Sequence, residues 1–317
     1  MPLPRVIRFS CCAEIPAPRC GNGLDLAVRL KNGVGPMVGT EHDTPEHSHT
    51  KCAGDASLGH RNLISYSRAL ACWGSLGGFD EEEGVLAFAG GSWIPVIGNG
   101  AFRTDNTVSP TTLVDRADNF FAGRQRGYSV KVRDTGQDDD LQEECGARGL
   151  VAYGEPVPEM ICHKLLPVPD LAQGLRLHQV TDAGGITAFT NVNTDAYATY
   201  GMPGDVLPDI FDQPDVVLAD PDTVIVVAYL DDRPVAAALT YFSDGIASLQ
   251  WVGTVSDVRH LSLGRAVTVW ATNVAFERGA MACTLQASPM GQPLYADLGY
   301  QTIYHYRDLV RWTAPTI

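Results

Sequence analysis

Apolar runs separated by short polar turns fill the second half of the chain. Residues 222–232 (DTVIVVAYLDD) and 233–244 (RPVAAALTYFSD) are apolar and β-branched, and each run breaks at a turn that contains Asp. Two such runs joined by a short polar turn predict a β-hairpin. A third run over residues 246–255 predicts another strand. Residues 265–278 then follow a helical pattern that ends at Gly279, a residue typical of a helix C-terminus.

Strands and helices continue to alternate in the rest of the chain. After the helix we expect a buried strand over Cys283–Ala287, a short helix over Pro289–Leu298 and a last strand over Tyr300–Trp312. The first half shows a similar order of elements. We expect helices over Arg61–Trp73, Thr111–Ala122 and Asp138–Arg148, and strands over Gly84–Ala89, Trp93–Ile97, Gly127–Arg133, Gly149–Tyr153 and Met160–Leu165.

Proline and glycine mark the expected domain boundaries. Residues 1–57 are rich in Pro, Gly, His and Cys with little apolar periodicity, which predicts an irregular N-terminal arm. Residues 166–174 (LPVPDLAQG) predict a linker between a half at 58–165 and a domain at 175–317. Residues 199–222, rich in Asp and Pro, predict a further loop.

The segment over residues 252–264 (VGTVSDVRHLSLG) carries the clearest chemical signal. It predicts a strand that stops, a tight loop and the start of a helix. The first amides of a helix have no partner within the helix, and the positive end of the helix dipole lies there. Together they form a site for an anion, and a pyrophosphate would fit it.

Two motifs in this region resemble those of the GCN5-related N-acetyltransferases (GNAT). Arg259, Ser262 and Gly264 match the acetyl-coenzyme A loop, Arg/Gln-x-x-Gly-x-Gly/Ala, except that Ser262 stands where the family has Gly. Because Ser reaches positive φ less readily, we expect weaker binding or a slightly shifted loop. Tyr295 followed by Leu298-Gly299-Tyr300 resembles the short helix that carries a Tyr and closes with Leu-Gly-Phe/Tyr. The resemblance covers residues 175–312.

The resemblance implies an α+β fold of GNAT type, with a mixed central sheet flanked by helices. Residues 58–165 repeat the order of elements but lack the Arg-x-x-Gly-x-Gly loop. We therefore expect two GNAT-like halves in tandem, the N-terminal one degenerate. The alternative is an unrelated α+β domain.

The implied activity is transfer of an acetyl group from acetyl-CoA, as acyl-donor cosubstrate and without a metal, to an amine. In the family the fourth strand bulges and its backbone holds the pantetheine arm, so Gly253 is either a bulge residue or a site that relieves crowding. Arg259 and Arg265 are either phosphate contacts or surface charges. The residues implied to bind the cofactor are Val252, Gly253, Thr254, Val255, Arg259, His260, Leu261, Ser262, Leu263, Gly264 and Arg265.

Tyr295 is the residue that the resemblance points to for protonating the departing thiolate. The alternative is a core tyrosine packed beside Leu294 and Leu298.

No general base is assigned. Glu277 is the sole Glu of the C-terminal half and lies at the far end of its helix, and His178 reads as structural. The possible bases are Asp205, Asp209, Asp212 and Asp244.

The net charge of −14 and the pI near 4.9 exclude a nucleic-acid partner and an anionic membrane surface. They suit a cationic acceptor, either a small-molecule amine or a protein amine. A homodimer stays open. A second functional reading is a non-catalytic acyl-CoA-binding or regulatory protein whose acceptor site has decayed, since the C-terminal half lacks a well-placed Glu.

Eight scattered cysteines, no apolar run of transmembrane length and no secretory signal predict a reduced cytoplasmic protein. His42, His47, His49 and Cys52 cluster in the arm, downstream of Cys11, Cys12 and Cys20. They are either a zinc site or a polar tail, and the tail is favoured because their spacing matches no common zinc pattern.

Overall fold

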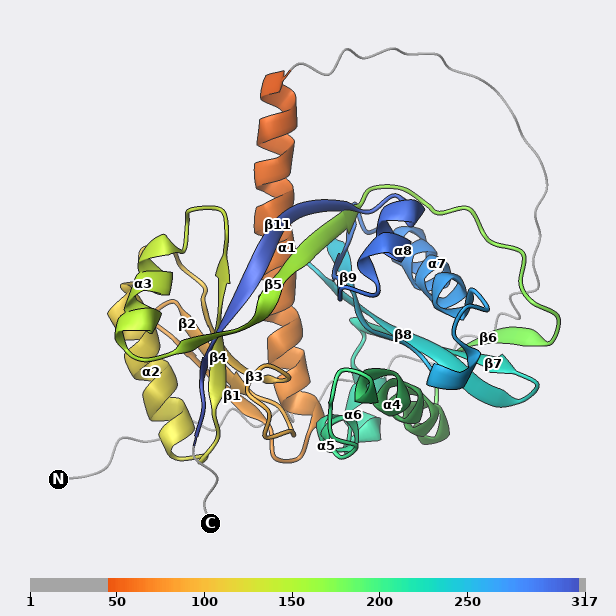
Figure 1. Cartoon of the computed structure of the whole chain (residues 1–317), viewed down its shortest axis with the longest axis horizontal. Coiled ribbons are helices and arrows are strands. Elements are labelled where there is room, and N and C mark those ends of the chain that lie inside the picture. The colour runs from red at the N-terminus through yellow and green to blue at the C-terminus, as the bar shows by residue number, and fades with distance from the viewer. Residues whose placement is uncertain (1–44, 314–317) are drawn as a thin grey trace, which may run out of the picture. The chain divides into compact units, whose positions relative to one another are not determined.

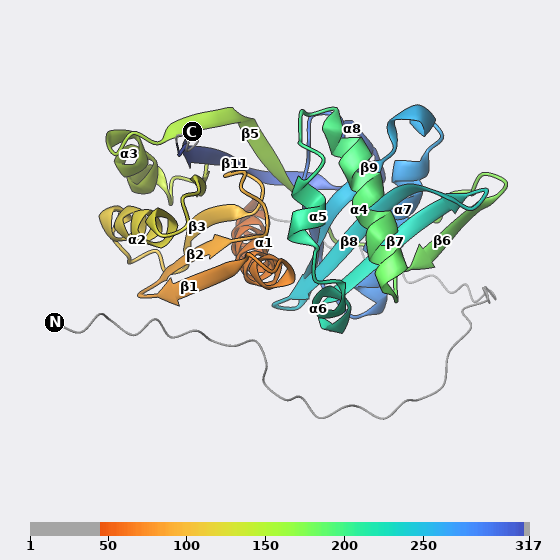
Figure 2. The same ribbon diagram turned by 90° about the horizontal axis from the view of Figure 1, so that it is seen from below.

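The structure is a computed structural model that describes residues 45–313 of the chain. One mixed sheet of 11 strands runs through both halves, and helices cover both of its faces (Figures 1 and 2). The N-terminal half contains α1 (Pro45–Trp73), β1 (Gly78–Glu82), β2 (Val85–Ala89), β3 (Asn99–Arg103), α2 (Pro110–Ala122), β4 (Tyr128–Arg133), α3 (Asp139–Ala147) and β5 (Val151–Cys162).

The C-terminal half repeats this order with additional helices. It contains β6 (Leu175–Gln179), α4 (Ala183–Ala198), α5 (Val206–Ile210), α6 (Pro214–Ala219), β7 (Thr223–Leu230), β8 (Arg233–Ser243), β9 (Ile246–Thr254), the 3₁₀ turn η1 (Ser256–Val258), α7 (Leu263–Glu277), β10 (Cys283–Gln286), α8 (Gln292–Leu298) and β11 (Gln301–Arg311). In each half one helix connects two parallel strands, as β3-α2-β4 and β9-α7-β10.

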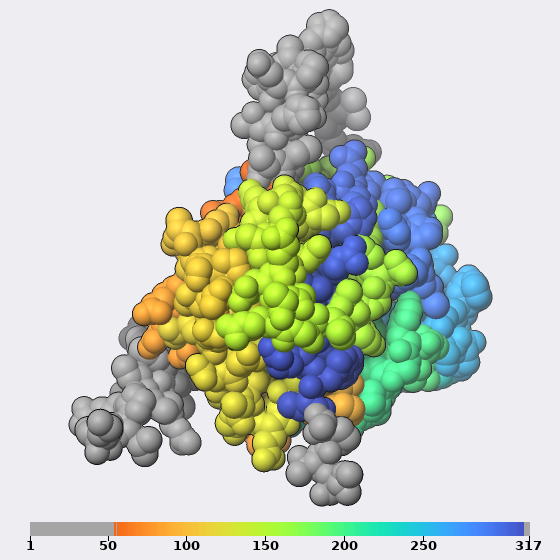
Figure 3. All heavy atoms as spheres, turned by 60° about the vertical axis from the view of Figure 1, so that its left-hand side comes forward, coloured from red at the N-terminus to blue at the C-terminus, as the bar shows by residue number. Residues whose placement is uncertain are grey.

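The two halves exchange their last strands. The strand order is β1-β2-β3-β4-β11-β5-β10-β9-β8-β7-β6. β11, from the end of the chain, pairs with β4 of the N-terminal half, while β5 pairs with β10 of the C-terminal half. β11 and β5 also pair with each other in antiparallel register. Figure 3 shows the C-terminal residues in blue lying among the yellow-green residues of the first half. Neither half therefore completes its sheet alone.

Helix α1 lies on one face of the sheet and reaches both halves (Figure 1). His60 packs against Phe102 of β3, and Tyr66, less than two turns later in the helix, packs against Tyr241 of β8. The main hydrophobic core accordingly includes residues of both halves. A second core lies under α2 and α3 on the opposite face. The sheet with its exchanged strands thus forms one packed body.

Most expected elements lie within a few residues of the observed ones, and four expectations are wrong. Residues 93–97 are not a strand, because Pro95 has no amide to donate and the side chain of Asn99 donates to the carbonyls of Ser92 and Ile94 instead. The two strands expected at 149–153 and 160–165 are one strand, β5, which bends around Gly154 (φ +64°).

The expected irregular arm is wrong for residues 45–57, which begin α1 with Pro45 at its first position, where proline is tolerated. The loop expected at 199–222 contains α5 and α6. Strands β1, β3 and β6 and helix α4 were not predicted from the sequence. The possible zinc ligands between Cys11 and Cys52 lie outside the side chains that the structure describes.

Candidate functional site

Strands β9 and β10 part from each other at one end. Their parallel pairing runs from Ala247 opposite Cys283 to Leu249 opposite Leu285 and goes no further. β9 nevertheless continues to Thr254, paired with β8 on its other side. One backbone edge of residues 250–254 therefore faces a gap rather than a neighbouring strand.

A β-bulge bends β9 at this gap. Gly253 pairs with Ala237 and Gln250 with Leu239, so two residues of β9 stand opposite one residue of β8. Trp251 has φ +52°, an uncommon conformation for a bulky side chain. The bulge is therefore centred at Trp251–Val252.

The surroundings of Gly253 decide between the two interpretations of this glycine, a bulge residue or a residue that relieves crowding. A Cβ there would lie 2.3 Å from Oδ1 of Asn193 and 3.0 Å from Cβ of Ala196, both on α4. Glycine is needed because α4 packs closely on the strand. Gly253 is therefore not the bulge residue. It relieves crowding against α4, and the bulge is formed by the neighbouring residues Trp251 and Val252.

Helix α7 begins directly beyond the end of β9. Among the residues that the structure describes, none accepts a hydrogen bond from the amides of Leu263, Gly264 or Arg265. The N-cap residue, Ser262, makes no side-chain capping bond. Free amides at the positive end of a 15-residue helix form an anion site. The local geometry that the sequence predicts is present.

The loop backbone is left-handed at two positions. His260 has φ +75° and Ser262 has φ +58°. Ser262 thus adopts the conformation for which glycine is preferred, at the position where the family motif has Gly. Both side chains and that of Leu261 are exposed.

The two arginines of the loop are engaged within the protein. Arg259 donates to the carbonyl of Ala196 at 3.1 Å and to Oγ1 of Thr199 at 3.3 Å, which ties the loop to the end of α4. Arg265 forms an ion pair with Asp297 of α8. In this arrangement backbone amides, more than arginine side chains, are free to hold a phosphate.

Small residues bring the end of β9, α7 and α8 together. A Cβ on Gly264 would lie 3.2 Å from Oγ1 of Thr254 and 3.8 Å from Cδ2 of Leu294. Val255 is buried, and its amide donates to the carbonyl of Val235 at 3.0 Å. Val252 is half-buried. The predicted cofactor residues therefore form one contiguous stretch along the strand end, the loop and the first turn of α7.

Tyr295 lies on α8, directly after Leu294. It is 7% exposed, and no hydrogen bond of its hydroxyl is found within the described residues. Burial, together with the nearby Tyr197 and Tyr200, raises the pKa of Tyr295 above its usual value. The hydroxyl therefore carries its proton at neutral pH, as a proton donor must.

Two tyrosines, one on α4 and one just after it, complete this side of the site. Tyr197 packs against Trp251 with ring centroids 5.6 Å apart, and the hydroxyl of Tyr200, on the residues following α4, donates to Oγ of Ser288 at 3.1 Å. These residues were missed, because the helical period of residues 183–198 was not interpreted. Tyr197, Tyr200 and Tyr295 thus flank the gap between β9 and β10.

None of the four candidate aspartates lies at this gap. Asp244 is in the turn before β9, at the opposite end of that strand from the bulge. Asp205 and Asp209 are exposed at helix α5, and Asp212 accepts hydrogen bonds from Ser75. Glu277 is the last residue of α7. None of these five carboxylates therefore lies next to the bulge.

The N-terminal half lacks the corresponding anion site. Its equivalent helix, α2, is capped by Ser109, whose Oγ accepts from the amide of Thr112 at 3.1 Å. Arg103 and Arg133, the buried last residues of β3 and β4, both pair with buried Asp138, at 3.2 and 2.7 Å. In the N-terminal half, protein side chains therefore occupy both the helix N-terminus and the space beyond the paired strands, which are open in the C-terminal half.

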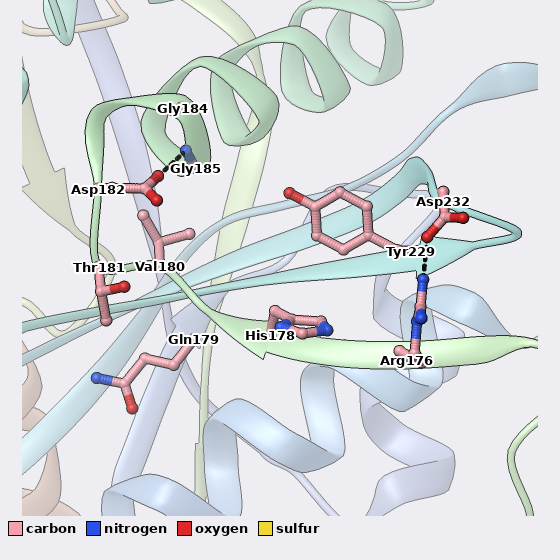
Figure 4. Close-up of a pocket in the computed structure, with 10 residues that line it drawn as sticks. All are labelled: Arg176, His178, Gln179, Val180, Thr181, Asp182, Gly184, Gly185, Tyr229 and Asp232. Carbon is pink, nitrogen blue, oxygen red and sulfur yellow. Dashed lines mark hydrogen bonds and ion pairs between the residues drawn. The ribbon is translucent and has the colours of Figure 1, made fainter. Parts of the chain in front are cut away.

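A separate hollow lies at the sheet edge between β6, the β7–β8 turn and the start of α4 (Figure 4). His178 stands edge-on to Tyr229, and Asp182 accepts from the amide of Gly185. The hollow contains no residue of the predicted site. Within residues 45–313, no group of three or more His, Cys, Asp or Glu side chains could hold a metal, and no described helix could cross a membrane.

Comparison with known proteins agrees with this geometry. Residues 170–285 match the family model for the acetyltransferase (GNAT) domain. A GCN5-related N-acetyltransferase from Kribbella flavida is similar in structure, with a TM-score of 0.59 and 19% identity over 80% of this chain and 95% of that one. A GCN5-related N-acetyltransferase from Sphaerobacter thermophilus has a TM-score of 0.54 and 14% identity over 76% and 84% of the two chains.

A third similar structure has two such domains. It is a tandem GNAT protein from the clavulanic acid biosynthesis pathway, with a TM-score of 0.51 and 12% identity over 77% of this chain and 86% of that one. No curated protein matches the sequence. The matched domain, the paired halves and the strand–loop–helix geometry lead to one conclusion: residues 170–285 carry an acetyltransferase (GNAT) domain, and the chain as a whole has the fold of tandem GNAT structures.

Proposed function

We propose that this protein transfers the acetyl group of acetyl-CoA to an amine. The observation that carries the proposal is the uncapped first turn of α7, placed directly beyond a bulged strand that parts from its neighbour. The amides of Leu263, Gly264 and Arg265 would bind the pyrophosphate. The free backbone edge of residues 250–254 would hold the pantetheine arm, so that the thioester lies at the bulge.

The reacting groups then follow from the position of the thioester. The amine nitrogen attacks the thioester carbonyl carbon, a C–N bond forms and the C–S bond breaks. Tyr295 would donate its proton to the departing sulfur. Tyr197, Tyr200 and Trp251 would line the side from which the acceptor arrives. The net charge of −14 favours a cationic acceptor.

The test has two stages. Thermal shift with acetyl-CoA, with free CoA and with adenosine as a ligand that lacks the pyrophosphate, measures binding at the loop. Release of free thiol from acetyl-CoA, followed against a panel of primary amines, measures transfer. Amine-dependent thiol release supports the enzyme, whereas binding without transfer to any amine supports the non-catalytic acyl-CoA-binding alternative.

A further inference from the structure

The exchanged strand β5 carries a carboxylate to the gap in the C-terminal half. Glu159 of β5 stands opposite Gln286, the last residue of β10. Gln286 directly follows Leu285, where the pairing of β9 with β10 ends. Glu159 therefore lies across the end of β10 from the point at which β9 and β10 part, although it belongs to the N-terminal half of the sequence.

The Glu159 carboxyl group is enclosed, and its Oε2 has no hydrogen-bond partner of ordinary geometry within the described residues, although Thr284 and Gln286 lie close enough to lower its pKa. Glu159 is 3% exposed. It lies under α1, since a Cβ on Gly59 of that helix would lie 3.3 Å from Oε1 of Glu159. Within the described residues, Oε2 of Glu159, Oγ1 of Thr284 and Nε2 of Gln286 have no hydrogen-bond partner. Buried polar atoms are rarely left unpaired without a functional reason or a bound molecule. This group of atoms points to a substrate or water at the gap.

The equivalent position in the other half is different. There Asp308 of β11 stands opposite Lys131 of β4, and Lys131 follows Val130, the last residue of β4 that pairs with β3. Nζ of Lys131 is 2.9 Å from Oδ1 of Asp308, so a cation neutralises that carboxylate. At the C-terminal gap Gln286 replaces the lysine, and Glu159 has no ion-pair partner in the part of the chain that the structure describes.

We propose that Glu159 is the general base that takes the proton lost by the acceptor amine. This inference rests on the proposed acetyl transfer. One N–H bond of the substrate ammonium breaks, and its proton passes to the Glu159 carboxylate, directly or through one water at the Gln286 side of the gap. The free amine then attacks the thioester. A C–N bond forms, the C–S bond breaks and the sulfur takes a proton from Tyr295. The nitrogen then loses its second proton, which returns through water to the Tyr295 oxygen, and Glu159 later returns its own proton to solvent.

The groups around Glu159 leave it to titrate near neutral pH. Burial raises its pKa to about 7, against the opposing effect of Thr284, Gln286 and Lys131. Burial lowers the pKa of His60 on α1 to about 3 and raises that of Cys283 on β10 to about 12. Burial also raises the pKa values of Tyr304 and Tyr306 on β11. At neutral pH these four neighbours are uncharged, and the carboxyl of Glu159 exchanges a proton.

The experiment compares Glu159→Gln with Glu155→Gln in the full chain. Glu155 is an exposed glutamate on the same strand, far from the pairing with β10. Thiol release from acetyl-CoA with the best amine of the panel is measured across pH. We expect kcat/KM of Glu159→Gln to fall about a hundredfold or more at pH 7 and to lose the limb with an apparent pKa near 7. Acetyl-CoA affinity and the Glu155→Gln profile should equal those of the wild type.

The other possible results distinguish failure of the Glu159 proposal from failure of the proposed acetyl transfer. An active wild type with an unchanged pH profile in Glu159→Gln would overturn the role of Glu159 and leave the acetyltransferase assignment intact. A wild type that binds acetyl-CoA but acetylates no amine would overturn both.

A variant and a spectroscopic measurement guard against misfolding of Glu159→Gln. Glu159→Asp keeps an acid one methylene further back, and it should keep the pH limb with a reduced rate. Infrared titration of the wild type should show a buried carboxyl band with a midpoint near 7. Absence of that band would also overturn the proposal.

Discussion

Arg103 and Asp138 form an ion pair, with Nη2 and Oδ1 3.2 Å apart, that joins the end of β3 to the segment after β4. Both side chains are buried, and Arg133 holds the same carboxylate. Breaking such a network by admitting a ligand would strand buried charges, at a cost of several kcal/mol.

We therefore predict one acetyl-CoA per chain. The ion-pair network and the Ser109 cap leave no room for a second pyrophosphate in the N-terminal half. Isothermal titration calorimetry at saturation should give a stoichiometry of one. Two equivalents bound per chain would show that the first half also has a functional site.

The loop backbone should matter more than its arginines. Gly264→Val places two methyl groups near Oγ1 of Thr254, which already lies 3.2 Å from an added Cβ, and crowds the amides that face the phosphate. We expect acetyl-CoA binding by calorimetry to be lost in Gly264→Val but only weakened in Arg265→Ala. Equal affinities for the wild type and Gly264→Val would remove the pyrophosphate from this turn.

Ser262 provides a test in which stability should increase. The left-handed backbone of Ser262 costs the folded state about 1–2 kcal/mol, a cost that glycine would avoid. The greater entropy of glycine in the unfolded chain offsets about 0.5–1 kcal/mol of this gain. Ser262→Gly should therefore raise the free energy of unfolding by about 0.5–1 kcal/mol in urea melts and should not weaken acetyl-CoA binding. Ser262→Ala, which keeps the strain and removes the hydroxyl, is the control. A loss of stability in the glycine variant would contradict this reading.

Tyr295→Phe separates chemistry from packing. The ring stays beside Gly291 and Tyr300, and only the hydroxyl is removed. Melting temperature and acetyl-CoA affinity should change little, while turnover should fall about a hundredfold or more. If activity survives, the leaving thiolate must be stabilised by backbone dipoles alone.

The raised pKa of Glu159 predicts how stability depends on pH. The folded protein binds this proton more tightly than the unfolded chain, whose glutamate has a pKa near 4.5. The contribution to stability is therefore complete below that value and is lost as pH rises towards 7. Between these two pH values the free energy of unfolding falls by roughly 3 kcal/mol for this single carboxyl group. Urea melts of the wild type should show this slope, and those of Glu159→Gln should lack it. Parallel slopes would mean that Glu159 is not protonated in the folded protein.

Local patterns in the sequence were sufficient to predict the elements that we propose bind the cofactor. The apolar runs of β7, β8 and β9, the helical period of α7 and the spacing of Arg259, Ser262 and Gly264 depend on neighbouring residues alone. Periodicity and turn residues report such short-range preferences directly. The anion site at the start of α7 follows from them, because a helix N-terminus has free amides wherever the chain places it.

Tertiary structure decided what fills and surrounds that site. The sequence could not show that Arg259 reaches the end of α4, that Gly253 is needed by Asn193, or that the bulge lies at Trp251. Least of all could it show that β5 and β11 exchange places, because strand partners are chosen by packing between residues far apart in the chain. That exchange brings Glu159 beside Gln286, more than a hundred residues later in sequence. A search for a base confined to the C-terminal half could not find it.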